Sequence, residues 1–169
     1  LSATGRAMIS VQQEHGLDRI GGWLILFLTG LLLTPIRLGV VLYKTFVPLF
    51  SDGTFGQLTT PSSDLYHPLW APLIAFELIG NLSVIALGLV TLYHFLRKSR
   101  KTKKYAIAWL LTAFAFVVID FFFADMIPSI AVQPADPESI KEVARSTVSA
   151  AIWVPYFLVS KRVKATFTR

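Results

Sequence analysis

The chain has 169 residues, of which 54% are hydrophobic and only 15% are charged, and it contains no cysteine. Soluble domains carry about 25% charged residues, and disordered chains are poor in the aromatic residues that are abundant here. The composition therefore excludes a disordered chain, a disulfide scaffold and a thiolate metal site, and it argues against a soluble domain. The net charge of +6 leaves nucleic-acid binding open until the positions of the charges are considered.

Four long apolar segments predict four membrane-spanning helices, because a span needs about 20 mostly apolar residues. The expected fold is all-α: a four-helix transmembrane bundle that forms one membrane domain. Pro35 is expected to kink the first helix near its far end. The fourth helix is the weakest, since its charge-free part is only the segment Ser146–Ser160. The predicted helices cover about residues 20–42, 69–96, 105–127 and 143–160.

The connecting segments differ in charge, and this difference predicts the orientation in the membrane. Lys and Arg crowd Arg97–Lys104 and follow the last helix, whereas Phe50–His67 and Pro128–Ser139 carry only acidic charges. Because Lys and Arg collect on the cytoplasmic side, both termini are predicted to be cytoplasmic. Residues 1–19 then form a short cytoplasmic segment before the membrane domain, residues 20–169. Topology explains the basic loop, so anionic lipid headgroups are expected as its partners and nucleic acid is not.

One charged residue in each predicted helix lies in the outer third of the membrane. At about 1.5 Å per residue, these residues lie about 23–29 Å from the cytoplasmic helix ends. Two are basic and two are acidic, so we expect a neutral polar cluster that joins all four helices. Asn81, Ser149 and Tyr156 share helix faces with these residues and are expected to support the cluster. The four charged residues are Arg37, Glu77, Asp120 and Arg145.

This cluster has two interpretations. It is either a structural clamp that fixes how the helices dock, or an ion, proton or ligand site that opens to the periplasm. The balanced charges and the shallow depth favour the clamp. The inner two-thirds of the predicted bundle contains no formal charge, which disfavours a conduit through the membrane. The sequence has no catalytic, phosphate-binding or metal-binding motif, so no cofactor and no metal ion are expected.

Three segments resemble a known family. They are RIGGWLILFLTGLLLTPIRL (Arg19–Leu38), the stretch Gly53–Asn81, and AIWVPYFLVSKRVKATF (Ala151–Phe167). They are similar to the YdgK-like family, small four-span proteins of the bacterial inner membrane with unknown function. The resemblance implies a four-span inner-membrane protein and brings no catalytic residues with it. The matching positions are Gly22, Trp23, Pro35, Glu77, Trp153, Pro155, Tyr156, Ser160, Arg162, Val163 and Phe167.

The leading functional hypothesis is a non-catalytic accessory or interaction subunit of a larger membrane complex, with a membrane protein as its partner. The chain is small, its loops are short, and the outer loop offers Phe55, Leu58, Leu65 and Tyr66 as contact residues. The alternative is a small transporter or sensor whose site is the charged cluster. A third and less favoured class is a membrane enzyme acting on lipid or quinone, which would need an opening between helices beside the acidic residues.

Overall fold

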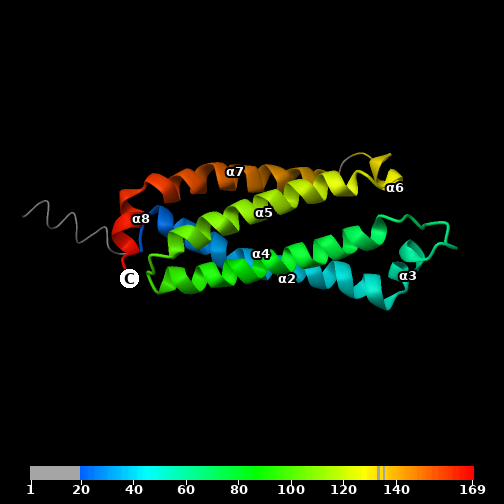
Figure 1. Ribbon diagram of the computed structural model, residues 1–169, viewed down its shortest axis with the longest axis horizontal. Coiled ribbons are helices and arrows are strands. Elements are labelled where there is room, and N and C mark those ends of the chain that lie inside the picture. Colours follow the sequence, from blue (N-terminus) through cyan, green and yellow to red (C-terminus); the bar gives the residue numbers. More distant parts are fainter. Residues whose placement is uncertain (1–19, 133, 135) are drawn as a thin grey trace, which may run out of the picture.

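The computed structural model describes residues 20–132, 134 and 136–169, and within them every regular element is a helix. Four long helices lie side by side, and three short helices lie near the two ends of the molecule (Figure 1). The predicted cytoplasmic segment, residues 1–19, lies outside the described residues. The long helices are α2 (Trp23–Ser51), α4 (Trp70–Leu96), α5 (Thr102–Ala124) and α7 (Pro137–Val159), and the short ones are α3 (Thr54–Thr59), α6 (Pro128–Ala131) and α8 (Lys161–Thr166).

Three of the long helices, α2, α4 and α5, are long and apolar enough to cross a membrane. The shortest of them, α5, extends about 35 Å at about 1.5 Å per residue, which exceeds a hydrocarbon core of about 30 Å. The helix α7 is as long as α5, but its first turns carry Glu138, Lys141, Glu142 and Arg145. The all-helical class is therefore confirmed, whereas apolar length alone does not identify α7 as a span.

The helix α2 is longer than predicted. Its expected end was near Leu42, yet it continues to Ser51 through Pro35 and Pro48. A proline in a membrane helix removes only its own N–H bond, and neighbouring groups can satisfy the freed carbonyl. The last turn closes where Asp52 N donates to Pro48 O at 3.0 Å. The loop predicted at Phe50–His67 is consequently shorter and contains the helix α3.

The helix α7 begins at Pro137, six residues before its predicted start. Asp136 is its N-cap, because its carboxylate accepts hydrogen bonds from Glu138 N at 3.2 Å and from Ser139 Oγ at 3.3 Å. Pro137 occupies the first helical position, where its fixed φ suits a helix. The segment Pro128–Ser139, predicted to be non-helical, therefore contains α6 and the start of α7.

The helices pack in the order α2, α4, α5 and α7, and glycines of α4 face aromatic rings of α5. A Cβ on Gly88 would lie 3.0 Å from Trp109 Nε1, which donates to Val84 O at 3.1 Å. A Cβ on Gly80 would overlap the ring of Phe116. Small residues are what allow membrane helices to approach this closely.

The two ends of the molecule differ in charge. The α4–α5 loop, α8 and the C-terminus lie at one end, and α3 and α6 lie at the other (Figure 1). The C-terminus is held there, since Arg169 N donates to Lys98 O at 3.2 Å and Arg100 N donates to Arg169 O at 2.6 Å. We call this the basic end, because it gathers the basic loop Arg97–Lys104 and the basic residues of 161–169. The opposite end, with Asp52, is called the acidic end.

Candidate functional site

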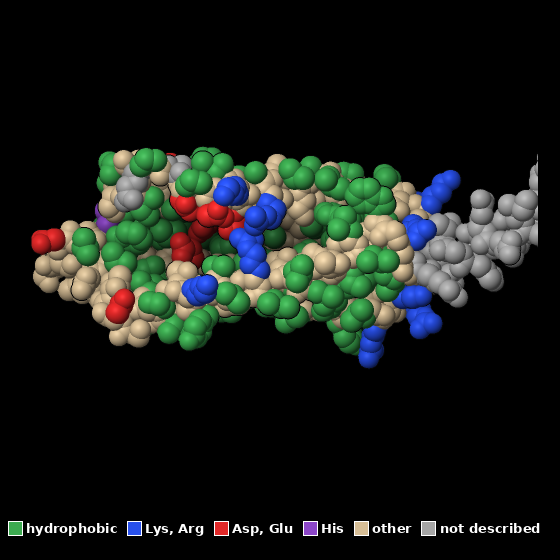
Figure 2. All heavy atoms as spheres, turned by 180° about the vertical axis from the view of Figure 1, so that it is seen from behind, with side chains coloured by type: hydrophobic (Ala, Val, Ile, Leu, Met, Phe, Trp, Pro, Cys, Tyr) green, Lys and Arg blue, Asp and Glu red, His purple; other side chains and the backbone are tan. Residues whose placement is uncertain are grey.

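A cavity of about 660 Å³ lies between the four long helices and extends toward the acidic end. This volume is within the range of about 300–1,000 Å³ that is usual for ligand pockets. Figure 2 shows acidic and basic side chains gathered in a hollow on one face of the molecule. The charged residues that line the cavity are Arg37, Glu77, Asp120, Asp125, Asp136, Glu142 and Arg145.

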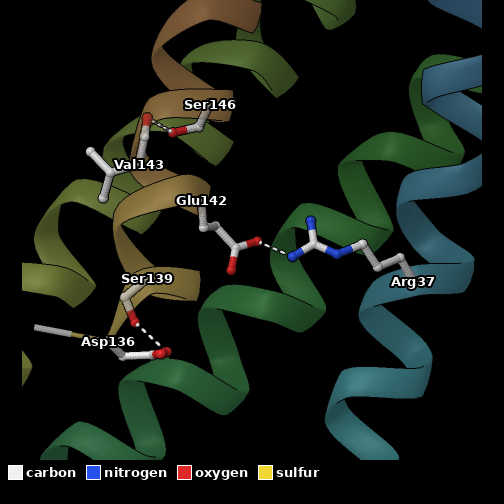
Figure 3. Close-up of polar contacts among 6 residues, drawn as sticks. All are labelled: Arg37, Asp136, Ser139, Glu142, Val143 and Ser146. Atoms are coloured by element: carbon white, nitrogen blue, oxygen red, sulfur yellow. Dashed lines mark hydrogen bonds and ion pairs between the residues drawn. The ribbon is translucent and has the colours of Figure 1, made fainter.

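All four of the charged residues predicted to cluster line this one cavity, each from a different helix. Arg37 reaches across from α2 and forms an ion pair with Glu142 of α7, with Nη2 and Oε1 2.7 Å apart (Figure 3). Both side chains are partly exposed, at 46% and 37%. The pair is therefore a bridge across the mouth of the cavity and not a buried contact.

Glu142 is one of three charged residues of the cavity wall that the sequence argument missed, the others being Asp125 and Asp136. Glu142 lies one helical turn before Ser146 and two turns before Ser149, on the face that lines the cavity. The predicted start of the fourth helix at residue 143 placed Glu142 in a loop, and the earlier start of α7 brings it into the site. The sequence signal that would have found it is Asp136 followed by Pro137, which is typical of an N-cap and the first position of a helix.

Three acidic side chains of the cavity lie close enough for their like charges to interact: Glu77 interacts with Asp120, and Asp120 interacts with Glu142. Asp120 Oδ1 is buried and accepts no hydrogen bond from the described residues. An ionised or polar group without a partner is costly in a membrane interior, where no lipid tail can donate to it. The site thus presents acceptor capacity that the described part of the protein does not use.

The charge balance differs from the predicted neutrality. Five acidic residues and two arginines line the cavity. The difference arises because Glu142 and the helix-end residues Asp125 and Asp136 join the predicted set. The arginines are exposed, while Glu77, Asp120 and Glu142 are half-buried, so the cluster is not a closed, paired unit.

Two of the three predicted supporting residues line the cavity. Asn81 and Ser149 are both part of its wall, and Asn81 Nδ2 donates to Glu77 O at 2.8 Å. Tyr156 is not part of the wall. It lies nearer the basic end, where its ring packs edge-on against Trp153 at 5.6 Å and against Phe157 at 5.9 Å.

An aromatic core lies between the cavity and the basic end. The ring of Phe27 lies 4.7 Å from Phe157, 5.2 Å from Trp153, and 5.9 Å from both Phe95 and Trp109. Phe27, Phe95 and Phe157 are each at most 3% exposed. Trp109 belongs both to this aromatic core and to the wall of the cavity.

The predicted contact loop lies at the acidic end around α3. Phe55 and Leu58 are half-buried, and the ring of Phe55 packs 5.0 Å from that of Phe50. Leu65 and Tyr66 are exposed, at 57% and 38%. Only these two of the four predicted residues therefore present their side chains outward.

Within residues 20–132, 134 and 136–169, no group of three or more His, Cys, Asp or Glu side chains is arranged to hold a metal ion.

Comparison with known proteins places this chain in a family. Residues 17–168 match the family described as "Protein of unknown function (DUF2569)". The chain is 31% identical over 157 residues to the inner membrane protein YdgK of Escherichia coli (strain K12), which covers 89% of this chain and 94% of that protein. No solved structure matches the chain. The resemblance drawn from three sequence segments is thereby confirmed, and the chain belongs to the DUF2569 family as a multi-pass integral protein of the inner membrane.

Proposed function

We propose that this protein binds a small ligand in the charged cavity, as a membrane sensor or transporter does, without catalysis. One observation carries the proposal: the four charged residues predicted to lie within spans line a common cavity of about 660 Å³. A structural clamp would pair these charges with one another. Arg37 pairs with Glu142 instead, and Asp120 Oδ1 accepts no hydrogen bond from the described residues. Unused donors and acceptors around an open volume are typical of a binding site.

We propose further that α7 is a fourth membrane span and that the basic end is cytoplasmic. The packing of α7 along α5 and the apolar second half of α7 support the span. The concentration of Lys and Arg at one end supports the orientation, because such residues are retained in the cytoplasm. In this orientation the cavity opens toward the periplasmic side.

The natural absence of cysteine makes this topology simple to test with single cysteines. Val132→Cys and Ser62→Cys, at the acidic end, should react with a membrane-impermeant maleimide in intact spheroplasts. Ser99→Cys and Thr168→Cys, at the basic end, should react only after the membrane is permeabilised. Equal reactivity of Val132→Cys and Thr168→Cys in intact spheroplasts would refute a fourth span.

Access to the cavity can be tested in the same way. Ser149 lines the cavity, whereas Gly39 of α2 lies on the outer face of the helices with no atom within 4 Å of its Cβ position. In nanodiscs, Ser149→Cys should react with methanethiosulfonate ethylammonium, and faster than with the anionic ethylsulfonate, because acidic residues outnumber basic ones in the wall. Gly39→Cys serves as the lipid-facing control. If Ser149→Cys is no more reactive than Gly39→Cys, the open-cavity proposal fails.

An interaction subunit is the second candidate. The outward-facing Leu65 and Tyr66 support it, because paired exposed apolar side chains at a membrane surface suit a protein contact. Photo-crosslinking from position 65 in native membranes should then trap one partner protein, with a crosslinker at position 62 as the control. Crosslinks only to lipid, or none, would argue against this role.

We propose that the basic end contacts anionic lipid headgroups. A shallow pocket of about 380 Å³ there is lined by Arg100, Lys103, Lys164 and Phe167 among others. Each basic residue near an anionic surface contributes about 1 kcal/mol. Vesicles with phosphatidylglycerol should therefore raise the melting temperature more than vesicles of phosphatidylcholine, and Lys164→Gln should reduce that difference.

A further inference from the structure

The cavity has an opening on its side, between α2 and α7. The helix α2 packs against α4, and α7 packs against α5, whereas α2 and α7 meet mainly through side chains. At the basic end these are the aromatic contacts of Trp23 and Phe27 with Trp153. At the level of the cavity the Arg37–Glu142 ion pair links the two helices and spans the space between them (Figure 3).

With α7 as a fourth span, as proposed above, this opening faces the bilayer as well as water. Arg37 and Glu142 are partly exposed beside apolar side chains of α2 that face outward, such as Ile36 at 64%. In a membrane, the surroundings of this face are lipid chains and headgroups. A lipid of the outer leaflet can therefore reach the cavity sideways, whereas a soluble ligand must enter from the acidic end.

The cavity wall offers a ligand a basic group and, separately, a pair of acidic groups. Arg145 lines the wall and makes no hydrogen bond or ion pair with a described residue. An arginine exposed to lipid is costly unless an anion accompanies it, and its planar guanidinium suits a phosphate. Glu77 and Asp120 carry the charge opposite to that of Arg145 and interact with each other electrostatically. Asp120 Oδ1 has no hydrogen-bond donor among the described residues.

The rest of the cavity wall mixes apolar side chains with the uncharged polar side chains of Thr34, Asn81, Ser146 and Ser149. Along α5 the lining runs from Asp125 near the acidic end to Trp109, a span of about 24 Å at about 1.5 Å per residue. The charges lie in the part nearer the acidic end, and the wall beyond them contains Ala113, Phe116 and Leu110. A ligand that fits this order has a charged head and an apolar tail.

We propose, building on the ligand-binding function above, that the cavity takes a phospholipid whose headgroup joins a phosphate to a primary ammonium. The phosphate lies against Arg145, with Arg37 beside it, and the ammonium lies between Glu77 and Asp120. One acyl chain enters the apolar part of the cavity along α5. The geometry favours a primary ammonium over a quaternary one, because only the primary group donates the hydrogen bonds that Asp120 lacks.

The test compares lipids that differ in one chemical feature. The purified protein in a mild detergent is titrated with phosphatidylethanolamine, phosphatidylcholine and phosphatidylglycerol of identical chains, and bound lipid is counted by native mass spectrometry. We expect phosphatidylethanolamine to bind about tenfold more tightly than phosphatidylcholine, the size of one charge-assisted hydrogen bond. Equal binding of the two lipids, or a preference for phosphatidylglycerol, would overturn the proposal.

Variants connect that preference to the named residues. Asp120→Asn and Glu77→Gln should each reduce the preference for the primary ammonium. Arg145→Gln should weaken phosphatidylethanolamine and phosphatidylcholine alike, since both carry the phosphate. The matched controls are Asp64→Asn in the outer loop and Lys141→Gln, whose side chain pairs with Glu138 and does not line the cavity. If the controls change the preference as much as the cavity variants, the assignment of these residues is wrong.

A soluble competitor separates this inference from the wider binding function. Phosphoethanolamine has the same charged groups and no chains, so it should compete only weakly with the lipid. Full competition by phosphoethanolamine would refute a lipid ligand while leaving a ligand-binding cavity in place. An unreactive Ser149→Cys would instead refute the open cavity itself, so the two failures are distinguishable.

Discussion

The basic half and the acidic half of the helix assembly differ in what fills the space between the helices. Near the basic end, Phe27 and its aromatic neighbours form a dry, tightly packed core in which Phe95 is fully buried. Near the acidic end, the same four helices separate around a cavity lined by charges. The comparison indicates that stability is concentrated in one half, which leaves the other half free to hold unpaired polar groups.

The largest effect is expected from breaking the aromatic core. Phe27→Ala removes the ring around which four other aromatic rings pack, and a buried Phe truncation costs about 3–5 kcal/mol. Thermal unfolding in detergent should show a clear loss of stability for this variant. Leu32→Ala on the same helix, whose side chain is 46% exposed, should unfold close to the parent protein. Similar losses for both variants would show that the core does not dominate stability.

A smaller effect is expected where the core half meets the cavity half. Gly80→Ala places a Cβ against the ring of Phe116, and overpacking of this kind costs about 1–3 kcal/mol. The control is Gly39→Ala, which has open space around the new methyl group. A second change, Phe116→Leu, should restore part of the stability that Gly80→Ala loses. The absence of any rescue would mean that the α4–α5 contact is not the cause.

The ion pair across the cavity should contribute little to stability. Its two side chains are partly exposed, and such pairs are worth about 1 kcal/mol or less. Arg37→Gln, Glu142→Gln and the double variant should therefore all retain most of the parental melting temperature. A loss of several kcal/mol in either single variant, relieved in the double variant, would instead support the structural clamp.

The smallest effect is expected at the exposed loop of the acidic end. Leu65→Ser changes a side chain that is 57% exposed, and such surface changes usually alter stability by about 0.5 kcal/mol or less. The melting temperature of the purified protein should not change measurably. A clear shift would show that Leu65 is packed against the helices in solution and is not available to a partner.

Much of the fold was predictable from composition and periodicity. Three candidate spans were located from long, mostly apolar runs, because the hydrocarbon core selects long segments with few charges. Helix ends were less predictable. The continuation of α2 through Pro48 and the start of α7 at Pro137 depend on local hydrogen bonds, which hydropathy does not measure.

Four of the seven charged residues of the candidate site were predicted, but its geometry was not. Arg37, Glu77, Asp120 and Arg145 were identified because charges are rare within spans and face the interior. The partner of Arg37 was not identified, since Glu142 lies outside the predicted fourth helix. Tyr156 was assigned to the cluster by helix periodicity, and the structure places it against Trp153 instead.

The sequence by itself determined that this is an all-helical membrane protein, that its charges divide between two ends, and which rare charged residues interrupt its apolar segments. These properties depend on the residue types and on their distance along the chain. Only the tertiary structure decided that the charges line an open cavity and that α2 and α7 leave a side opening. Those features depend on which side chains fill the space between helices, and a layer of charge at one depth is compatible with either a sealed clamp or an open site.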